Sequence, residues 1–96
     1  MPAKGWVIPL EHNDYMIIKR ILQGRSTISS EARDGGVTRQ SMSVKVKRIQ
    51  RFLLMKLNIE GAFDEVVRDP YMRHDILRFI SIKERELSGA IRNGNR

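Results

Sequence analysis

Six basic side chains and no acidic one lie in the 21 residues from Val37 to Leu57. The six are Arg39, Lys45, Lys47, Arg48, Arg51 and Lys56. The chain before this segment has five bases and four acids, and the chain after it has seven of each, so the segment supplies six of the seven net positive charges. Guanidinium and ammonium groups bind phosphate and carboxylate oxygens. Because like charges on one helix repel each other, this concentration predicts an anionic partner; the alternative is a solvated helix face that lacks acids.

The amino-terminal part of this segment adds side chains that can contact the edges of DNA bases. Arginine pairs most often with guanine and glutamine with adenine, so we expect Arg39 and Gln40 to read bases. Ser43 and Val44 follow about one helical turn later, where they can supply a hydroxyl contact and a contact to a thymine methyl group. The side chains predicted to bind DNA phosphates are Arg25, Thr27, Thr38, Lys45, Lys47, Arg48 and Arg51.

Two predicted helices position these side chains. Thr38 is a candidate N-cap for a helix over 39–57, and either Ser26 or Thr27 can cap a shorter helix over 27–34. Apolar residues at steps of three and four form the buried stripe expected of the longer helix. The stripe consists of Met42, Val46, Ile49, Phe52, Leu53 and Leu57.

The spacing within residues 27–57 is that of a helix-turn-helix. Ala32 is small where the two helices cross, Gly36 allows the turn, and we expect Val37 to fill the space between the helices. Two features depart from the usual pattern: Gly35 precedes Gly36, and Glu31 stands where an apolar residue is common. They predict a shortened or tilted first helix of the motif, or alternatively an ordinary helical hairpin with a glycine turn.

The rest of the chain predicts a compact all-α domain of five helices without a wing, formed by residues 1–96 as one unit. Residues 1–9 are expected to form an N-terminal arm. A helix is expected over 11–23, ended by Gly24. Residues 58–88 are expected to hold two C-terminal helices, over about 59–68 and from Pro70, preceded by an Asp69 cap, to about Leu87. Residues 89–96 are expected to be a flexible tail.

The segment from Ile18 to Phe52, about a third of the chain, resembles the DNA-binding core of two groups of small regulators. These are the KorA (TrfB)-type plasmid repressors and the PapB-type regulators of fimbrial operons. The likeness lies in Leu22-Gln-Gly24, Val37-Thr38-Arg39, Ser41-Met42-Ser43 and Val46-Lys47-Arg48-Ile49. The resemblance implies a dimeric or oligomeric regulator that binds an operator or an AT-rich control region, with the helix after Thr38 in a groove. The pattern is also similar to the last region of sigma factors and to the DNA-binding part of phage small terminases.

The function expected from these observations is sequence-specific binding of double-stranded DNA by a transcriptional regulator, acting as a homodimer or higher oligomer. One alternative is a DNA-packaging, replication or partition adaptor with the same motif. Another is a helical module whose basic helix binds RNA or an acidic protein. The predicted dimer surface lies on the last helix and consists of Phe79, Ile80, Ile82 and Leu87. The same residues are alternatively needed to close the core of the monomer, and Trp6 in the arm is a second candidate surface.

Other classes of function find little support in the composition. The chain has no cysteine and two histidines far apart in sequence, so we expect no disulfide, no metal site and no cofactor. No catalytic constellation is recognisable, and neither an enzyme nor a small-molecule ligand is predicted. No apolar run is long enough to span a membrane, and we expect a cytoplasmic protein.

Overall fold

A computed structural model describes the backbone of residues 9–94 and the side chains of residues 9–89. The described residues form five α-helices and no strand, as the sequence predicts. The helices are α1 (His12–Leu22), α2 (Ile28–Gly35), α3 (Arg39–Lys56), α4 (Phe63–Val66) and α5 (Pro70–Gly94). None of these helices is both long enough and apolar enough to cross a lipid bilayer.

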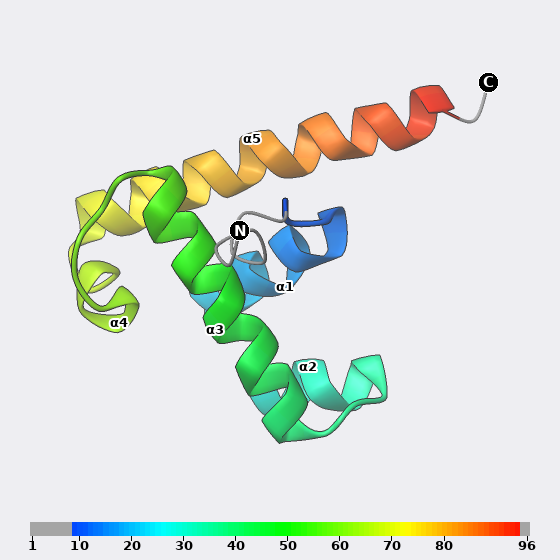
Figure 1. Ribbon diagram of the computed structural model, residues 1–96, viewed down its shortest axis with the longest axis horizontal. Coiled ribbons are helices and arrows are strands. Elements are labelled where there is room, and N and C mark those ends of the chain that lie inside the picture. The colour runs from blue at the N-terminus through cyan, green and yellow to red at the C-terminus, as the bar shows by residue number, and fades with distance from the viewer. Residues whose placement is uncertain (1–8, 95–96) are drawn as a thin grey trace, which may run out of the picture.

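The helix α3 links the two ends of the molecule (Figure 1). Its N-terminal end packs against α2, and α3 also contacts α4, which lies close to the start of α5. The helix α1 contacts both α3 and α5. The C-terminal end of α5 projects beyond the other helices (Figure 1). Within the described residues, the first half of α3 is thus supported mainly by α1 and α2.

The hydrophobic core lies where α1, α3 and α5 meet. Its most deeply buried large side chains are Ile18, Val46, Ile49, Leu53, Ile76 and Ile80. Ile80, one of the residues predicted at the dimer surface, is enclosed by its own domain, where its side chain is not available to a second copy. Phe79 and Leu87 are partly buried against the same core, whereas Ile82 is exposed. The predicted surface therefore consists mostly of residues that close the monomer.

Three helices end in the same way, with a residue of positive φ followed by a backbone bond that spans five residues. Gly24, Gly36 and Asn58 have φ angles of 75°, 69° and 56°. The next backbone N–H in each case donates to the carbonyl five positions earlier, over 2.9, 3.0 and 2.9 Å respectively. This is the Schellman arrangement, which satisfies carbonyl groups at a helix end. The positions of Gly24 and Gly36 agree with the sequence-based prediction of helix ends.

The helix starts also follow local signals. The hydroxyl oxygen of Thr27 accepts from the backbone N–H of Ser30 at 3.1 Å, and that of Thr38 accepts from the backbone N–H of Ser41 at 3.0 Å. At the start of α5, the carboxylate of Asp69 accepts from the backbone N–H of Tyr71 at 2.9 Å. Thr27, rather than Ser26, is therefore the cap of α2.

Three local expectations are corrected. The helix expected over 59–68 is only the four-residue α4, because Gly61 has a φ of 111°, outside the helical region, and no helix can run through it. The tail expected from residue 89 is helical as far as Gly94, since extending an existing helix costs little even at a glycine. Val37, expected to fill the space between α2 and α3, is 46% exposed. Most of the expected arm, including Trp6, lies outside the described residues.

Candidate functional site

The helices α2 and α3 form a compact helix-turn-helix unit. Ala32 of α2 and Met42 of α3 are both buried at their contact. A Cβ atom placed on Gly35 would lie 3.8 Å from the terminal methyl carbon of Met42, which is ordinary van der Waals contact. The left-handed conformation of Gly36 then turns the chain toward Thr38, the N-cap of α3. The first turns of α3 are thereby fixed against α2 while their opposite face stays open.

The open face of α3 carries one stripe of exposed side chains. Gln40, Val44, Lys47 and Arg51 follow each other at steps of four, three and four, and all four are exposed. Val44 is 65% exposed, a high value for an apolar side chain in a small domain. Within the described part of the chain, neither Lys47 nor Arg51 makes a salt bridge or a side-chain hydrogen bond. The stripe therefore combines two bases that have no ion-pair partner among the described residues with the amide of Gln40 and the apolar side chain of Val44.

Arg39 lies on the edge of this stripe that faces α2. Its Nε–H donates to Oγ of Ser29 in α2 at 2.9 Å, and both side chains are exposed. A single exposed hydrogen bond of this kind contributes little net free energy, because water can replace either partner. Arg39 is therefore held across the α2–α3 junction but remains open to an external partner.

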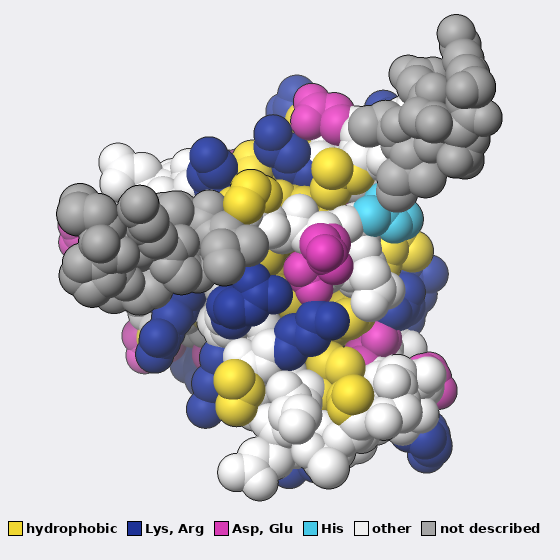
Figure 2. All heavy atoms as spheres, turned by 45° about the vertical axis from the view of Figure 1, so that its right-hand side comes forward, with side chains coloured by type: hydrophobic (Ala, Val, Ile, Leu, Met, Phe, Trp, Pro, Cys, Tyr) yellow, Lys and Arg dark blue, Asp and Glu magenta, His cyan; other side chains and the backbone are white. Residues whose placement is uncertain are grey.

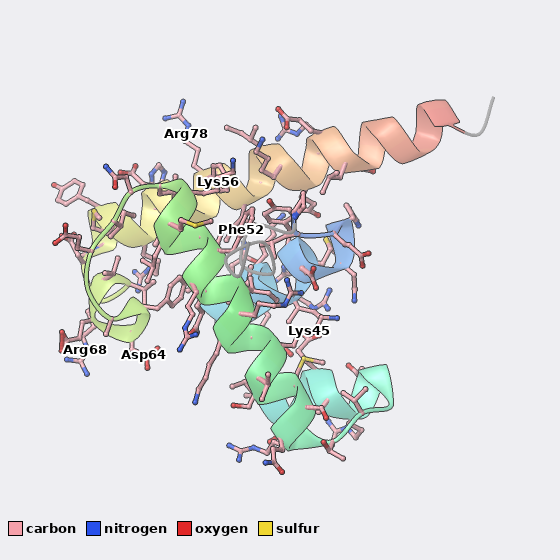
Figure 3. The ribbon with its side chains drawn as sticks, in the orientation of Figure 1. Lys45, Phe52, Lys56, Asp64, Arg68 and Arg78 are labelled. Carbon is pink, nitrogen blue, oxygen red and sulfur yellow. The ribbon has the colours of Figure 1, made fainter. Side chains whose placement is uncertain are left out.

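Lys45 and Arg48 lie on the other edge of the stripe, which faces α1. Lys45 Nζ is 3.4 Å from Oδ1 of Asp14, and an Nη atom of Arg48 is 3.6 Å from Oδ2 of the same carboxylate. Figure 3 shows Lys45 reaching from α3 into the space beside α1. Asp14 itself is buried, with a side-chain exposure of 4%. Two of the bases that the sequence singles out for phosphate contacts are thus attracted to an acid of their own chain.

A second buried carboxylate joins α1 to α2. Nε and Nη2 of Arg20 donate to the two carboxylate oxygens of Glu31, each at 2.8 Å. These hydrogen bonds hold the pKa of Glu31 below its usual value, although burial acts in the opposite direction. The same hydrogen bonds raise the pKa of Arg20. Glu31, which the sequence marks as unusual for this motif, is therefore accommodated by a two-point ion pair.

The remaining side chains predicted to contact DNA lie around the same end of the molecule. Thr27 and Thr38 are exposed at the first positions of α2 and α3, although both hydroxyls are used as helix caps. Arg25 is exposed between α1 and α2, and Ser43 is half-buried on α3. On the face drawn in Figure 2, several Lys and Arg side chains lie close together at mid-height. The predicted residues therefore lie on α3 as far as Arg51, at the start of α2 and in the loop before it.

Sequence reasoning missed Asp14 and the partner of Glu31. Asp14 has one local signal, because it stands three residues after Glu11, the N-cap of α1, and its carboxylate accepts from the Glu11 backbone N–H at 3.0 Å. That spacing is the one a capping box requires. Its second role, opposite Lys45 and Arg48, depends on how α1 packs against α3 and leaves no trace in local sequence.

The described residues contain no group of three His, Asp or Glu side chains close enough to hold a metal ion. Comparison of the chain with family models, with curated proteins and with solved structures gave no match. The proposals that follow therefore depend on the residues of this chain and on their geometry.

Proposed function

We propose that this protein binds double-stranded DNA through α3 and acts as a sequence-specific transcriptional regulator. The observation that carries the proposal is the exposed stripe of Gln40, Val44, Lys47 and Arg51 on a helix held by α1 and α2. Such a helix fits the width of the DNA major groove, and the preceding helix of a helix-turn-helix crosses the backbone. The predicted resemblance to small plasmid and fimbrial regulators points the same way but stays a prediction.

The stripe and its edges suggest a division of roles. Gln40 and Val44, with Arg39 and Ser43 at their side, are suited to base edges. Lys47 and Arg51 are suited to phosphates, because each offers a charge without an internal partner among the described residues. Arg25 and the start of α2 at Thr27 can add phosphate contacts at a helix N-terminus. Four to six phosphate contacts would give a log–log salt dependence with a slope of roughly −4 to −5.

The test is a salt titration of binding to duplex DNA, after a preferred sequence has been selected from a pool of random duplexes. Lys47→Ala and Lys56→Ala are a matched pair, because both remove an exposed lysine of α3 and only Lys47 lies in the stripe. Lys47→Ala is expected to weaken binding to all duplexes and to reduce the salt slope by about one. Lys56→Ala is expected to change neither. Gln40→Ala is expected to cost about 1–3 kcal/mol on the preferred sequence only.

Three results would contradict this proposal or part of it. If Lys47→Ala and Lys56→Ala weaken binding equally, the affinity reflects overall charge and not the stripe. If the unmodified protein prefers no duplex, a capture experiment with structured RNA or an acidic protein becomes the next step. If it binds duplex as a closed ring, the packaging adaptor is favoured over the regulator.

A homodimer is part of the proposal, with a revised surface on α5. Arg78 and Ile82 lie on the face of α5 opposite the buried Ile76 and Ile80, and Figure 3 shows Arg78 pointing away from the body. In an antiparallel pair of α5 helices centred near Ile80, Asp75 of each copy lies beside Arg85 of the other, which is the self-complementarity that a two-fold axis requires.

The dimer is tested by light scattering after size-exclusion chromatography. Asp75→Arg and Arg85→Asp are each expected to shift the protein toward the monomer, since each places like charges opposite one another. The double variant is expected to restore the dimer. A monomeric unmodified protein, or a double variant no better than either single one, would overturn the proposed surface.

A further inference from the structure

Asp14 is buried against the basic helix without the hydrogen bonds that a buried carboxylate usually has. One of its oxygens, Oδ2, accepts from the Glu11 backbone N–H. The other, Oδ1, is enclosed and has no hydrogen-bond partner among the residues that the structure describes. Lys45 Nζ stands 3.4 Å from Oδ1, and Arg48 approaches Oδ2 at 3.6 Å. Apart from the bond from the Glu11 backbone N–H, the charge of the carboxylate is therefore met by two bases at a distance.

These distances are longer than those of a tight ion pair. A charge-assisted bond from nitrogen to a carboxylate oxygen measures about 2.7–2.9 Å. The side chains of Lys45 and Arg48 are 36% and 44% exposed, so their charged groups also reach water. Attraction to Asp14 keeps the two bases near α1, yet neither is bound so firmly that an external anion could not take it.

An ionised carboxylate facing two bases offers them the same chemistry as a backbone phosphate, namely a negative charge spread over oxygens. A DNA phosphate that approached this edge of α3 would compete with Asp14 for Lys45 and Arg48. Every such contact then requires the attraction to Asp14 to be given up. The cost is the same for all DNA sequences, because Asp14 is inside the protein and touches no base.

We propose that Asp14 is an internal competitor of DNA phosphates, which occupies Lys45 and Arg48 in the free protein and limits the affinity for duplex DNA of any sequence. This inference rests on the proposed DNA-binding function. It makes Asp14 a residue that acts through Lys45 and Arg48, without contact to DNA. It also separates the bases of α3 into two kinds, because Lys47 and Arg51 carry no such restraint.

The test compares Asp14→Asn with the unmodified protein on one preferred duplex and one unrelated duplex at low salt. Asparagine keeps an oxygen that can accept from the Glu11 backbone N–H, so the cap of α1 is retained while the charge is removed. We expect the affinity for both duplexes to rise by the same factor, about three- to tenfold. Asp34→Asn is the matched control, because it removes an equal charge from an exposed residue of α2, and it should change affinity less than twofold.

A second background shows whether Asp14 acts through the two bases. In the Lys45→Gln/Arg48→Gln variant, adding Asp14→Asn is expected to give no further gain in affinity. A melting curve for each variant, including the triple one, verifies that the fold is retained.

The outcomes separate this inference from the proposed function. If the unmodified protein binds duplex DNA and Asp14→Asn gives no gain, or a gain equal to that of Asp34→Asn, the competitor role is refuted and DNA binding stands. If the gain persists when Lys45 and Arg48 are neutralised, Asp14 does not act through them and the proposal fails. If no variant binds duplex DNA at low salt, the proposed function and this inference fall together.

Discussion

The two buried carboxylates of the helix-turn-helix region differ in how their charge is met. Glu31 receives two hydrogen bonds of 2.8 Å from one guanidinium group, and its side chain is 5% exposed. Asp14 is equally buried at 4%, but its two bases stand off at 3.4 and 3.6 Å. A two-point pair fixes both partners and serves the fold. A loose contact leaves its bases available for an external anion.

The largest effect is expected from removing the tight partner. Arg20→Ala leaves the Glu31 carboxylate buried without its two hydrogen bonds, and we expect it to lower the free energy of unfolding by about 2 kcal/mol. Urea denaturation followed by circular dichroism measures this loss. Arg33→Ala removes an exposed arginine of α2 and should change the same quantity by less than about 0.5 kcal/mol. Equal effects of the two substitutions would mean that the Arg20–Glu31 pair does not stabilise the fold.

A smaller effect of the same Arg20–Glu31 pair is expected in the dependence of the free energy of unfolding on pH. The pKa of Glu31 is lowered in the folded protein by the hydrogen bonds from Arg20. The unfolded chain therefore takes up the proton first as the pH falls, so the stabilisation is fully present above the ordinary pKa of 4.5 and is lost as the pH falls through the lower, folded pKa.

Melting temperatures of the unmodified protein and of Glu31→Gln, measured between neutral pH and strong acid, test this expectation. The difference between the two proteins should be constant above the ordinary pKa of 4.5 and should shrink below it. A difference that stays constant throughout the acid range would show that the ionised form of Glu31 is not favoured by folding.

The smallest effect is expected at the loose contact. Lys45→Gln removes a base that is 3.4 Å from Asp14 and about a third exposed, so the loss in unfolding free energy should be at most about 0.5 kcal/mol. The same denaturation experiment provides the value. A loss as large as that of Arg20→Ala would place Lys45 among the residues that hold the fold, and the distinction between the two carboxylates would disappear.

The helix boundaries were largely predictable because their signals are local. Thr27 and Thr38 cap α2 and α3 through bonds to residues three positions ahead, and Gly24 and Gly36 end helices through their own φ angles. The length of α4 was not predictable in the same way. Apolar spacing around Phe63 favours a longer helix, whereas the φ angle of Gly61 depends on how the loop leaves α3.

The candidate site was predictable in its location but not in its internal contacts. The excess of bases over 37–57 is visible in composition, and the helical spacing separates Gln40 from the buried Met42. The same patterns do not indicate which of these bases have an acidic partner in the folded chain. Asp14 meets Lys45 because α1 packs on α3, and Glu31 meets Arg20 because α2 follows α1 at a particular angle. Contacts between separate helices have no periodic pattern in one sequence.

Because α3 is long, a small rotation of the helix in the core shifts its distant N-terminal end. Ile49 and Leu53 hold its second half in the main core, and its first half, which packs on α1 and α2 through the buried Met42 and Val46, carries Gln40 away from that core. Gln40 stands nine residues before Ile49, which is about 13.5 Å along the helix, so a rotation of about 5° near Ile49 moves Gln40 by about 1 Å. Packed interiors transmit such strain because they contain few voids. A change of one methylene group deep in the molecule can therefore shift the position of Gln40 without touching the surface on which it lies.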